Sequence, residues 1–390
     1  MNSVVRQFRD FFVSLKLTVV LLVLGMLLVF AATIDQVNLG IWGIQQKWFR
    51  TFFVLQDFRG IPIPVFPGGY FIGGLLLINL ISAHVYRFKF TARKAGIFLT
   101  HVGLIMLLVG ELLTGLWQED YSMRITEGES KNYAESFHHN ELAIVDVTDP
   151  QSDEVVAIPE KLLARGAPLQ HPKLPFRVVI KAYYPNAALG LREAAAAAPA
   201  VTPDATAGIG QRIGVTPLPV TYKQNERNLP AAFVELVAPG GSLGTWMVSA
   251  HPNMVPQRFE HGGRSWKIAL RFERAYKPFS LTLLDFSHDR YAGTEIPKNF
   301  SSRVKLATPE GRDDREVLIY MNNPLRYAGL TFYQASYDGE KTTVFQVVRN
   351  PSWLMPYLAC ALMTLGLVIQ FGIHLVGFVQ KRRAARLAVA

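Results

Sequence analysis

The sequence has little cysteine and little charge, and each shortage excludes a class of protein. Cys360 is the single cysteine among 390 residues, so the chain cannot form an internal disulfide framework, a C-x-x-C redox centre or a covalent C-x-x-C-H haem site. Charged residues make up 18% and apolar residues 50% of the chain, whereas soluble domains contain about 25% charged residues. A wholly soluble protein is therefore not expected, and a disordered chain or a collagen-like fibre is excluded.

The net charge of +10 is concentrated in three short segments. They hold eleven basic residues against one acidic residue, Asp10, so they account for the whole excess: Arg6, Arg9 and Lys16; Arg87, Lys89, Arg93 and Lys94; Lys381, Arg382, Arg383 and Arg386. The remainder is neutral and forms no basic stripe, so we expect no nucleic-acid partner. Lys and Arg are retained in short cytoplasmic loops of membrane proteins, and the three clusters therefore indicate a membrane topology.

Four apolar stretches are candidates for membrane spans, which need about 20 helical residues. If all four cross, the three basic clusters fall on one side, with both termini in the cytoplasm. The predicted order is a cytoplasmic N-terminus at 1–16, a first span at 17–34, an extracytoplasmic loop at 35–69, a second span at 70–86, a cytoplasmic loop at 87–94, a third span at 95–116, a large extracytoplasmic domain at 117–350, a fourth span at 353–379 and a cytoplasmic tail at 380–390.

The large segment between the third and fourth spans is predicted to be rich in β-strands. It contains many short runs of Val, Ile, Phe, Tyr and Thr, such as RVVIKAYY and LTFYQASY, and several of them alternate apolar and polar residues as half-buried strands do. Gly240–Gly244 matches the G-x-S-x-G nucleophile pattern, but a strand-like run follows where a helix is needed, so we interpret it as a hairpin turn. The low-complexity stretch 194–210 is predicted to be a mobile loop insertion.

Three histidines, His84, His101 and His374, lie inside predicted spans, where ionisable side chains are rare and usually functional. Counting from the nearest basic residue at 1.5 Å per residue, His84 lies about 4.5 Å and the other two about 10 Å from the cytoplasmic edge. A neutral imidazole can ligate haem iron, relay protons or hydrogen-bond a neighbouring helix as a purely structural group. These alternatives remain open at this point, and His374 is closest to the structural one.

The third span carries glycines at seven-residue spacing, at Gly96, Gly103 and Gly110. Seven residues return almost to the same helix face, so these positions form a smooth surface for close helix packing. His101 lies two residues from Gly103, roughly on the opposite face at 100° per residue, and we expect it to face a different neighbour. Glu111 lies near the outer end of this span, where it is interfacial or serves a proton or cation.

The chain resembles the ResB family of cytochrome c biogenesis proteins, also called CcsB, of the System II pathway. The resemblance extends over nearly the whole length, through the order of spans and the large outer domain. The matching segments are NLISAHVYRF (79–88), FLTHVGLIMLLVG (98–110), GTEIPKNFSSRVKL (293–306), MNNPLRYAGLTFYQASY (321–337) and RNPSWLMPYLACALMTLGLVIQF (349–371).

The resemblance implies a subunit that handles haem b across the cytoplasmic (inner) membrane of a bacterium. Its expected partners are a CcsA/ResC-type membrane protein, apocytochrome c and a thiol-reducing thioredoxin-like protein. The match around NLISAHVYRF implies that His84 ligates haem iron, while His101 matches a histidine typical of the family's third span. Arg87 and Arg93, with Lys89 and Lys94, are placed to meet the haem propionates; the alternative is that they only set the topology.

The sequence departs from the paired system in having no tryptophan-rich haem-handling motif, because its six tryptophans are scattered. We therefore expect the ResB half alone, a non-catalytic or co-catalytic subunit of a haem lyase complex rather than an enzyme by itself. The short N-terminus without a transit peptide favours a bacterium over a chloroplast. The alternatives are an envelope sensor or docking scaffold without haem, and a small-solute transporter; the short cytoplasmic segments and the absence of a visible repeat count against them.

Overall fold

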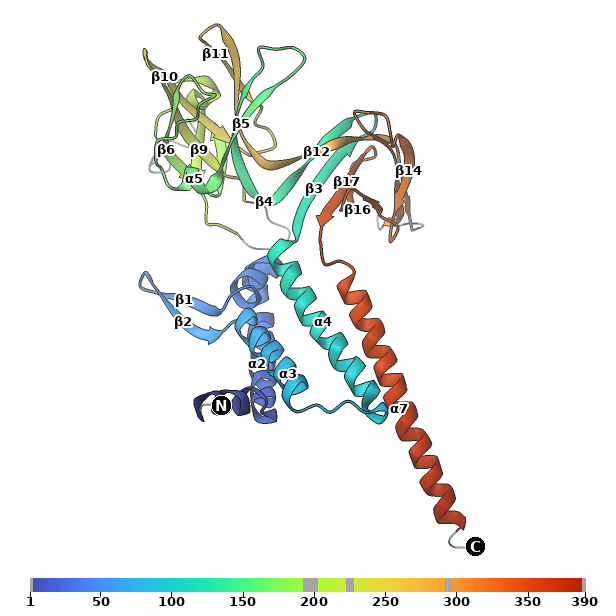
Figure 1. Ribbon diagram of the computed structural model, residues 1–390. Helices are drawn as coiled ribbons and strands as arrows, with labels where there is room; N and C mark the ends of the chain where they lie inside the picture. The colour runs from blue at the N-terminus through green and yellow to red at the C-terminus, as the bar shows by residue number, and fades with distance from the viewer. Residues whose placement is uncertain (1–2, 192–202, 222–227, 292, 294–296, 388–390) are drawn as a thin grey trace. The chain divides into compact units, whose positions relative to one another are not determined.

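The computed structural model describes residues 3–191, 203–221, 228–291, 293 and 297–387. The chain divides into two compact units (Figure 1). The helical unit contains the described parts of 1–119 and 350–390, and the β-rich unit contains those of 120–221 and 225–349.

Four helices of the helical unit are long and apolar enough to cross a membrane. This confirms the prediction of four apolar helices and marks the chain as a membrane protein. Their bounds are α2 Leu15–Ile44, α3 Gly69–Tyr86, α4 Ala95–Trp117 and α7 Met355–Leu387, with a short 3₁₀ turn η2, Ala92–Lys94, before α4.

Helix α2 continues well past residue 34, where the sequence predicts the end of the first span. The charge expected to stop it, Asp35, accepts hydrogen bonds from Lys47 Nζ at 2.8 Å and Trp48 Nε1 at 2.9 Å. A kink at Gly40, whose φ is 64°, and a π-helical turn η1, Gln45–Phe49, bring these partners back to the carboxylate. A paired charge at a kink therefore does not end the helix.

The segment predicted only as a cytoplasmic N-terminus contains a helix, α1, Ser3–Phe12. Its junction with α2 is held by Asn79 of α3, which is 3% exposed. The Asn79 amide donates to the carbonyls of Phe12 at 2.6 Å and Ser14 at 3.2 Å, and its oxygen accepts from the Thr18 hydroxyl at 2.6 Å. A buried amide with all these partners fixes the corner.

Helices α4 and α7 pack closely through the predicted glycine face. A Cβ on Gly96 would lie 2.4 Å from the Gly366 carbonyl oxygen, and one on Gly103 would lie 2.7 Å from the Ala359 carbonyl oxygen. Gly110 is also buried against α7, at Met355. The prediction of a close-packing face is confirmed, and its partner is α7.

Between α2 and α3 the chain forms a hairpin that the sequence analysis did not predict. Its strands are β1, Phe53–Phe58, and β2, Ile61–Pro67. Prolines occupy three of the β2 positions, and proline within a run argues against an ordinary strand. The prolines therefore weaken the strand pattern of the segment IPIPVFPGG.

The β-rich unit is built on a sheet of ten strands in the order β14-β13-β12-β4-β3-β17-β16-β15, with β11 paired to β12 and β5 to β4. A three-stranded sheet, β10-β9-β6, and a two-stranded sheet, β7-β8, complete it. The bounds are β3 Glu119–Thr126, β4 Ser130–Asp146, β5 Glu154–Pro159, α5 Glu160–Ala164, β6 Arg177–Tyr184, β7 Ala187–Leu191, η3 Gly208–Gln211, β8 Ile213–Pro217, β9 Ala231–Ala238, β10 Gly241–Ser249, β11 Gln257–His261, β12 Arg264–Arg290, β13 Pro297–Ala307, β14 Arg315–Tyr320, β15 Leu325–Tyr327, β16 Leu330–Asp338 and β17 Thr342–Arg349.

Two long strands, β4 and β12, run through both of the larger hydrophobic cores of this unit. One core gathers around Trp266 and Leu142, and the other around Phe332 and Phe345. Because the side chains of a strand alternate between faces, a long strand can contribute to one core near its start and to another near its end. The runs SWKIALRF and SLTLLDF, which the sequence predicts as two strands, form the single strand β12.

Two smaller predictions within this unit can also be compared with the structure. Gly241 opens β10 and pairs with Ala238 of β9, so the G-x-S-x-G match lies at a hairpin turn, as interpreted. Of the stretch 194–210, residues 194–202 lie outside the described part. The rest packs on the domain, because Ala205 is buried and the amides of Thr206 and Ala207 donate to the Thr245 carbonyl at 3.0 and 3.1 Å. That part belongs to the fold rather than to a loop insertion.

Candidate functional site

The structure brings together two of the three histidines that the sequence singles out. His84 of α3 and His101 of α4 approach with Nε2 of His84 and Nδ1 of His101 3.1 Å apart. Their ring centroids are 4.7 Å apart and the rings are nearly perpendicular. Both rings are half-buried. His101 thus faces α3 while the glycines of the same helix face α7, as the spacing predicts.

The hydrogen bonds of this pair determine which nitrogen has a free lone pair. His84 Nδ1 lies 3.0 Å from the Leu80 carbonyl oxygen, which can only accept, so this nitrogen carries the hydrogen. In a neutral ring the other nitrogen is then an acceptor, and His84 Nε2 must accept from His101 Nδ1–H. This assignment, made from the hydrogen-bond network, leaves His101 Nε2 as the nitrogen whose lone pair has no partner among the described residues.

Phenylalanines surround the histidine pair. Phe88 stacks on His84 with centroids 5.0 Å apart, and Phe98 lies 6.4 Å from the same ring. Phe90 packs edge-on against Phe98 at 5.5 Å. Both Phe90 and Phe98 are exposed, so they offer apolar ring surface beside an imidazole. This combination suits a flat, apolar ligand with a metal at its centre.

The connection between α3 and α4 adds positive charge next to the pair. Arg87, Lys89, Arg93 and Lys94 are all exposed. Within the described residues, none of the four forms an ion pair with a carboxylate. Their charges are therefore available to an anionic group from outside the chain.

The weaker candidates are placed differently. His374 is exposed on α7, and its Nε2 lies 3.0 Å from Gln370 Nε2, one turn away on the same helix. This contact belongs to α7 alone and does not join His374 to the pair. Glu111 is exposed on the surface of α4.

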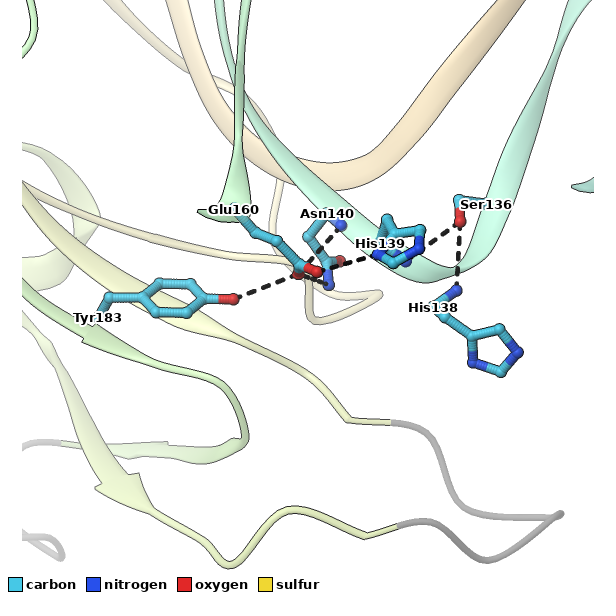
Figure 2. A network of polar contacts seen from close by, with 6 residues as sticks. All are labelled: Ser136, His138, His139, Asn140, Glu160 and Tyr183. Atoms are coloured by element: carbon cyan, nitrogen blue, oxygen red, sulfur yellow. Dashed lines mark hydrogen bonds and ion pairs between the residues drawn. The ribbon is translucent and has the colours of Figure 1, made fainter. Parts of the chain in front are cut away.

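A second histidine site lies in the β-rich unit, at the adjacent residues His138 and His139 of β4, which a regular strand would turn to opposite faces. Figure 2 shows that β4 bulges there, and the backbone amides of His138 and His139 both donate to Ser136 Oγ, at 3.3 and 3.1 Å. His139 Nδ1 pairs with Glu160 Oε1 at 3.2 Å. The other Glu160 oxygen accepts from the backbone and side-chain nitrogens of Asn140 and from the Tyr183 hydroxyl. One carboxylate thereby ties β4, α5 and β6 together.

The charges in this network are mutually stabilised. The hydrogen bond to Glu160 raises the pKa of His139 above its usual value, against the effect of burial. Burial pushes the pKa of Glu160 upward, but hydrogen bonds from His139 and Asn140 outweigh it, so the Glu160 pKa is lowered overall. Burial and the nearby carboxylate raise the pKa of Tyr183. The network therefore favours an ionised Glu160 and a protonated His139. Among the described residues, no three His, Cys, Asp or Glu side chains are grouped so that they could hold a metal ion.

Comparison with known proteins finds a family to which part of the chain is similar. Residues 240–344 match the model of the ResB-like family. The matched range includes two of the segments that carry the resemblance in sequence, 293–306 and 321–337.

Two curated proteins are similar to parts of this chain. Protein NrfI of Wolinella succinogenes is 26% identical over 307 residues, which cover 76% of this chain and 29% of NrfI. The cytochrome c biogenesis protein CcsB of Synechococcus sp. is 35% identical over 100 residues, which cover 26% of this chain and 22% of CcsB. The matched part thus spans less than a third of the length of each relative.

Proposed function

We propose that this chain is a membrane subunit of a cytochrome c maturation complex of the System II type and that haem b is its cargo. The observation that carries the proposal is the hydrogen-bonded pair His84–His101, with a nitrogen lone pair that has no partner among the described residues, in a chain related to a named cytochrome c biogenesis protein. In this proposal the chain acts as a non-catalytic or co-catalytic subunit, because its scattered tryptophans do not form the tryptophan-rich haem-handling motif that the resemblance assigns to the partner.

The pair has the properties that haem capture requires. Neutral imidazole is a common axial ligand, and a ligating histidine usually donates its other N–H to an acceptor that orients it. In the proposed complex His84 supplies the iron ligand, as the family resemblance implies, once its Nε2 is released from His101. Ligation by His101 Nε2 requires no change in either ring, with His84 as the orienting acceptor.

The surroundings suit the rest of the haem molecule. Phe88, Phe90 and Phe98 provide apolar surface for the porphyrin ring. Arg87 and Arg93 of the neighbouring connection provide charge-assisted hydrogen bonds for the propionates. In this proposal the connection lies on the cytoplasmic side, where haem is collected.

The proposed topology follows from the basic clusters. Both termini and the connection between α3 and α4 are in the cytoplasm, and the β-rich unit is outside the inner membrane of a bacterium. There the β-rich unit docks a CcsA/ResC-type partner, apocytochrome c and a thiol-reducing thioredoxin-like protein.

An absorption spectrum of the purified protein, reduced and oxidised, tests the proposal. The chain is produced with and without a CcsA-type partner, and His84→Ala and His101→Ala are compared with His374→Ala. We expect a Soret band that weakens in the first two variants and is unchanged in the third, whose histidine is exposed on α7. The variant that converts the spectrum from low spin to high spin identifies the iron ligand.

The controls separate a lost site from a lost protein. Expression level and thermal stability are measured for every variant, because a misfolded protein also loses haem. A band that forms only with the partner places the proposed site at the subunit interface. Absence of haem from both preparations, with the proteins intact and associated, contradicts the proposal and reduces the pair to a packing contact.

A further inference from the structure

The β1–β2 hairpin has a rigid base at the ends of two membrane helices. Its first strand follows η1 at the end of α2, and its second strand runs into α3 through Gly68. Gly68 N donates to the Phe52 carbonyl at 2.8 Å and Tyr70 N to the Thr51 carbonyl at 3.2 Å. A Cβ on Gly68 would lie within van der Waals overlap of the Thr51 backbone, so only glycine permits this closure. The level of the hairpin is thereby fixed relative to α3.

Beyond its base the hairpin exposes mostly apolar side chains, together with the polar Gln56, Asp57 and Arg59. Phe58 and Ile61 are 61% and 64% exposed, and Ile63 and Val65 are exposed as well. The base is different, because Val54 is buried against the helices. A two-stranded hairpin is only marginally stable on its own in water, so its apolar end requires a covering surface.

The backbone of the open β2 edge bears on which kind of surface could cover the hairpin. Pro62 pairs with Asp57 and Pro64 with Leu55. Since proline has no N–H, these cannot be the doubly hydrogen-bonded pairs of the ladder, which fall instead at Gln56–Ile63 and Phe58–Ile61. The outward positions of the described stretch 61–64 are thus the two prolines, and the edge offers no N–H donor.

The β2 edge therefore disfavours docking by strand addition there, which relies on backbone hydrogen bonds. By the same alternation the N–H groups of Leu55 and Asp57 face outward on the β1 edge. The prolines lower the cost of an apolar environment on the β2 side, because an N–H without a partner is unfavourable there. The turn supplies the polar part: Arg59 and Gly60 both have positive φ, and Asp57 Oδ1 accepts from Gly60 N at 2.7 Å. This places the cationic side chain of Arg59, a group that can pair with a phosphate, at the tip of the hairpin.

We infer that the β1–β2 hairpin is an interfacial anchor that lies in the boundary between the headgroups and the acyl chains of the bilayer, at the end where α2 meets α3. The partner is therefore the lipid surface itself. The inference depends on the helices crossing a bilayer and is independent of haem binding.

Spin labels measure the depth of the hairpin directly. In a Cys360→Ser background, Ile61→Cys is labelled with a nitroxide in nanodiscs of phosphatidylcholine and phosphatidylglycerol. Collisions with oxygen, which concentrates in lipid, are compared with those of a water-soluble nickel chelate. Glu310→Cys, on an exposed side chain of the β-rich unit, is the aqueous reference, and Ile78→Cys, exposed on α3, is the membrane reference. Phe58→Cys provides a second hairpin position.

The expected result is an oxygen-to-nickel ratio for both hairpin labels between those of the two references. A ratio equal to that of Glu310→Cys overturns the inference. Labels shielded from both reagents also overturn it, because they show a protein surface covering the hairpin. If the label at residue 78 also behaves as aqueous, the helices do not cross the bilayer, and the failure then lies in the topology.

Discussion

The β-rich unit and the basic connection between α3 and α4 differ in how their basic side chains are paired. In the β-rich unit, basic residues are paired across strands, as in Arg271–Glu141 at 2.8 Å and Lys181–Glu235 at 2.7 Å. In the helical unit, the basic cluster between α3 and α4 has no carboxylate partner among the described residues. One set of charges therefore stabilises its own domain, and the other is available to a ligand or a membrane surface.

The units also differ in what holds them together. The β-rich unit has extensive hydrophobic cores and ion pairs at their edges. The helical unit relies on close backbone approach at glycines of α4 and α7 and on a few buried polar groups such as Asn79. A helix bundle in lipid gains little from burying apolar surface, so packing and interhelical hydrogen bonds hold it together. Four variants test this contrast.

The largest effect is expected from Arg271→Gln in the β-rich unit. Its partner Glu141 is 6% exposed, and removing one member of a buried ion pair leaves an uncompensated charge that costs about 3–5 kcal/mol. Arg303→Gln is the matched control, because its pair with Asp285 is exposed on both sides and is worth less than about 1 kcal/mol. Chemical unfolding of the purified chain compares the two. Equal losses would show that burial does not distinguish these pairs.

Gly96→Ala is expected to have the next largest effect. An added methyl group meets the backbone of Gly366 and Gln370, which cannot rotate away, and such overpacking costs about 1–3 kcal/mol. Gly73→Ala on α3 is the control, since its Cβ has no neighbour within 4 Å and alanine favours a helix by up to about 1 kcal/mol. Thermal unfolding in detergent should therefore shift in opposite directions. A stabilised Gly96→Ala would contradict the close packing of α4 on α7.

Neutralising Arg87 and Arg93 together, as Arg87→Gln and Arg93→Gln, should change ligand retention more than stability. These side chains are exposed and without a carboxylate partner in the described part, and exposed ion pairs are worth up to about 1 kcal/mol. We expect haem retention up to about fivefold weaker and an unchanged melting temperature. Accessibility labelling must first show that insertion is unaltered, because the same charges also set topology. Unchanged haem content would show that Arg87 and Arg93 do not hold haem, and setting the membrane topology would remain as their role.

The sequence predicted the features that depend on local patterns. Four apolar runs, a β-rich segment and the glycine face of α4 are all visible as composition or spacing. The spacing also predicted that His101 lies on the face of α4 opposite the glycines. It was therefore expected to contact a different helix from the one that packs on the glycines. The hairpin β1–β2 was missed because its prolines, which weaken a strand signal, here lie at the outward positions of an edge strand.

The features that depend on tertiary contacts could not be predicted. Nothing in the sequence gives the rotation of α3 relative to α4, so the contact between His84 and His101 was not foreseen. The depths of His84 and His101, counted along the helix axes at 1.5 Å per residue, differ by about 5.5 Å. In the structure, His84 Nε2 and His101 Nδ1 are nevertheless 3.1 Å apart. Likewise, the bulge that turns His139 toward Glu160 follows from a register shift between β4 and β12 that no local pattern encodes.

The smallest effect is expected from His139→Gln, and it has a defined pH window. The His139 pKa is raised by its bond to Glu160 from 6.5, so this stabilisation is fully present below pH 6.5 and disappears as pH rises through the folded-state value. The Glu160 pKa is lowered from 4.5, so its contribution is present above pH 4.5 and disappears on further acidification. The pair therefore stabilises most between these limits. Because the His139 side chain is 50% exposed, the loss should be about 0.5 kcal/mol. Melting temperatures of the wild type and His139→Gln should differ near pH 5.5 and converge as the pH rises above the folded-state pKa of His139; a pH-independent difference would mean that the pair contributes by packing and not by charge.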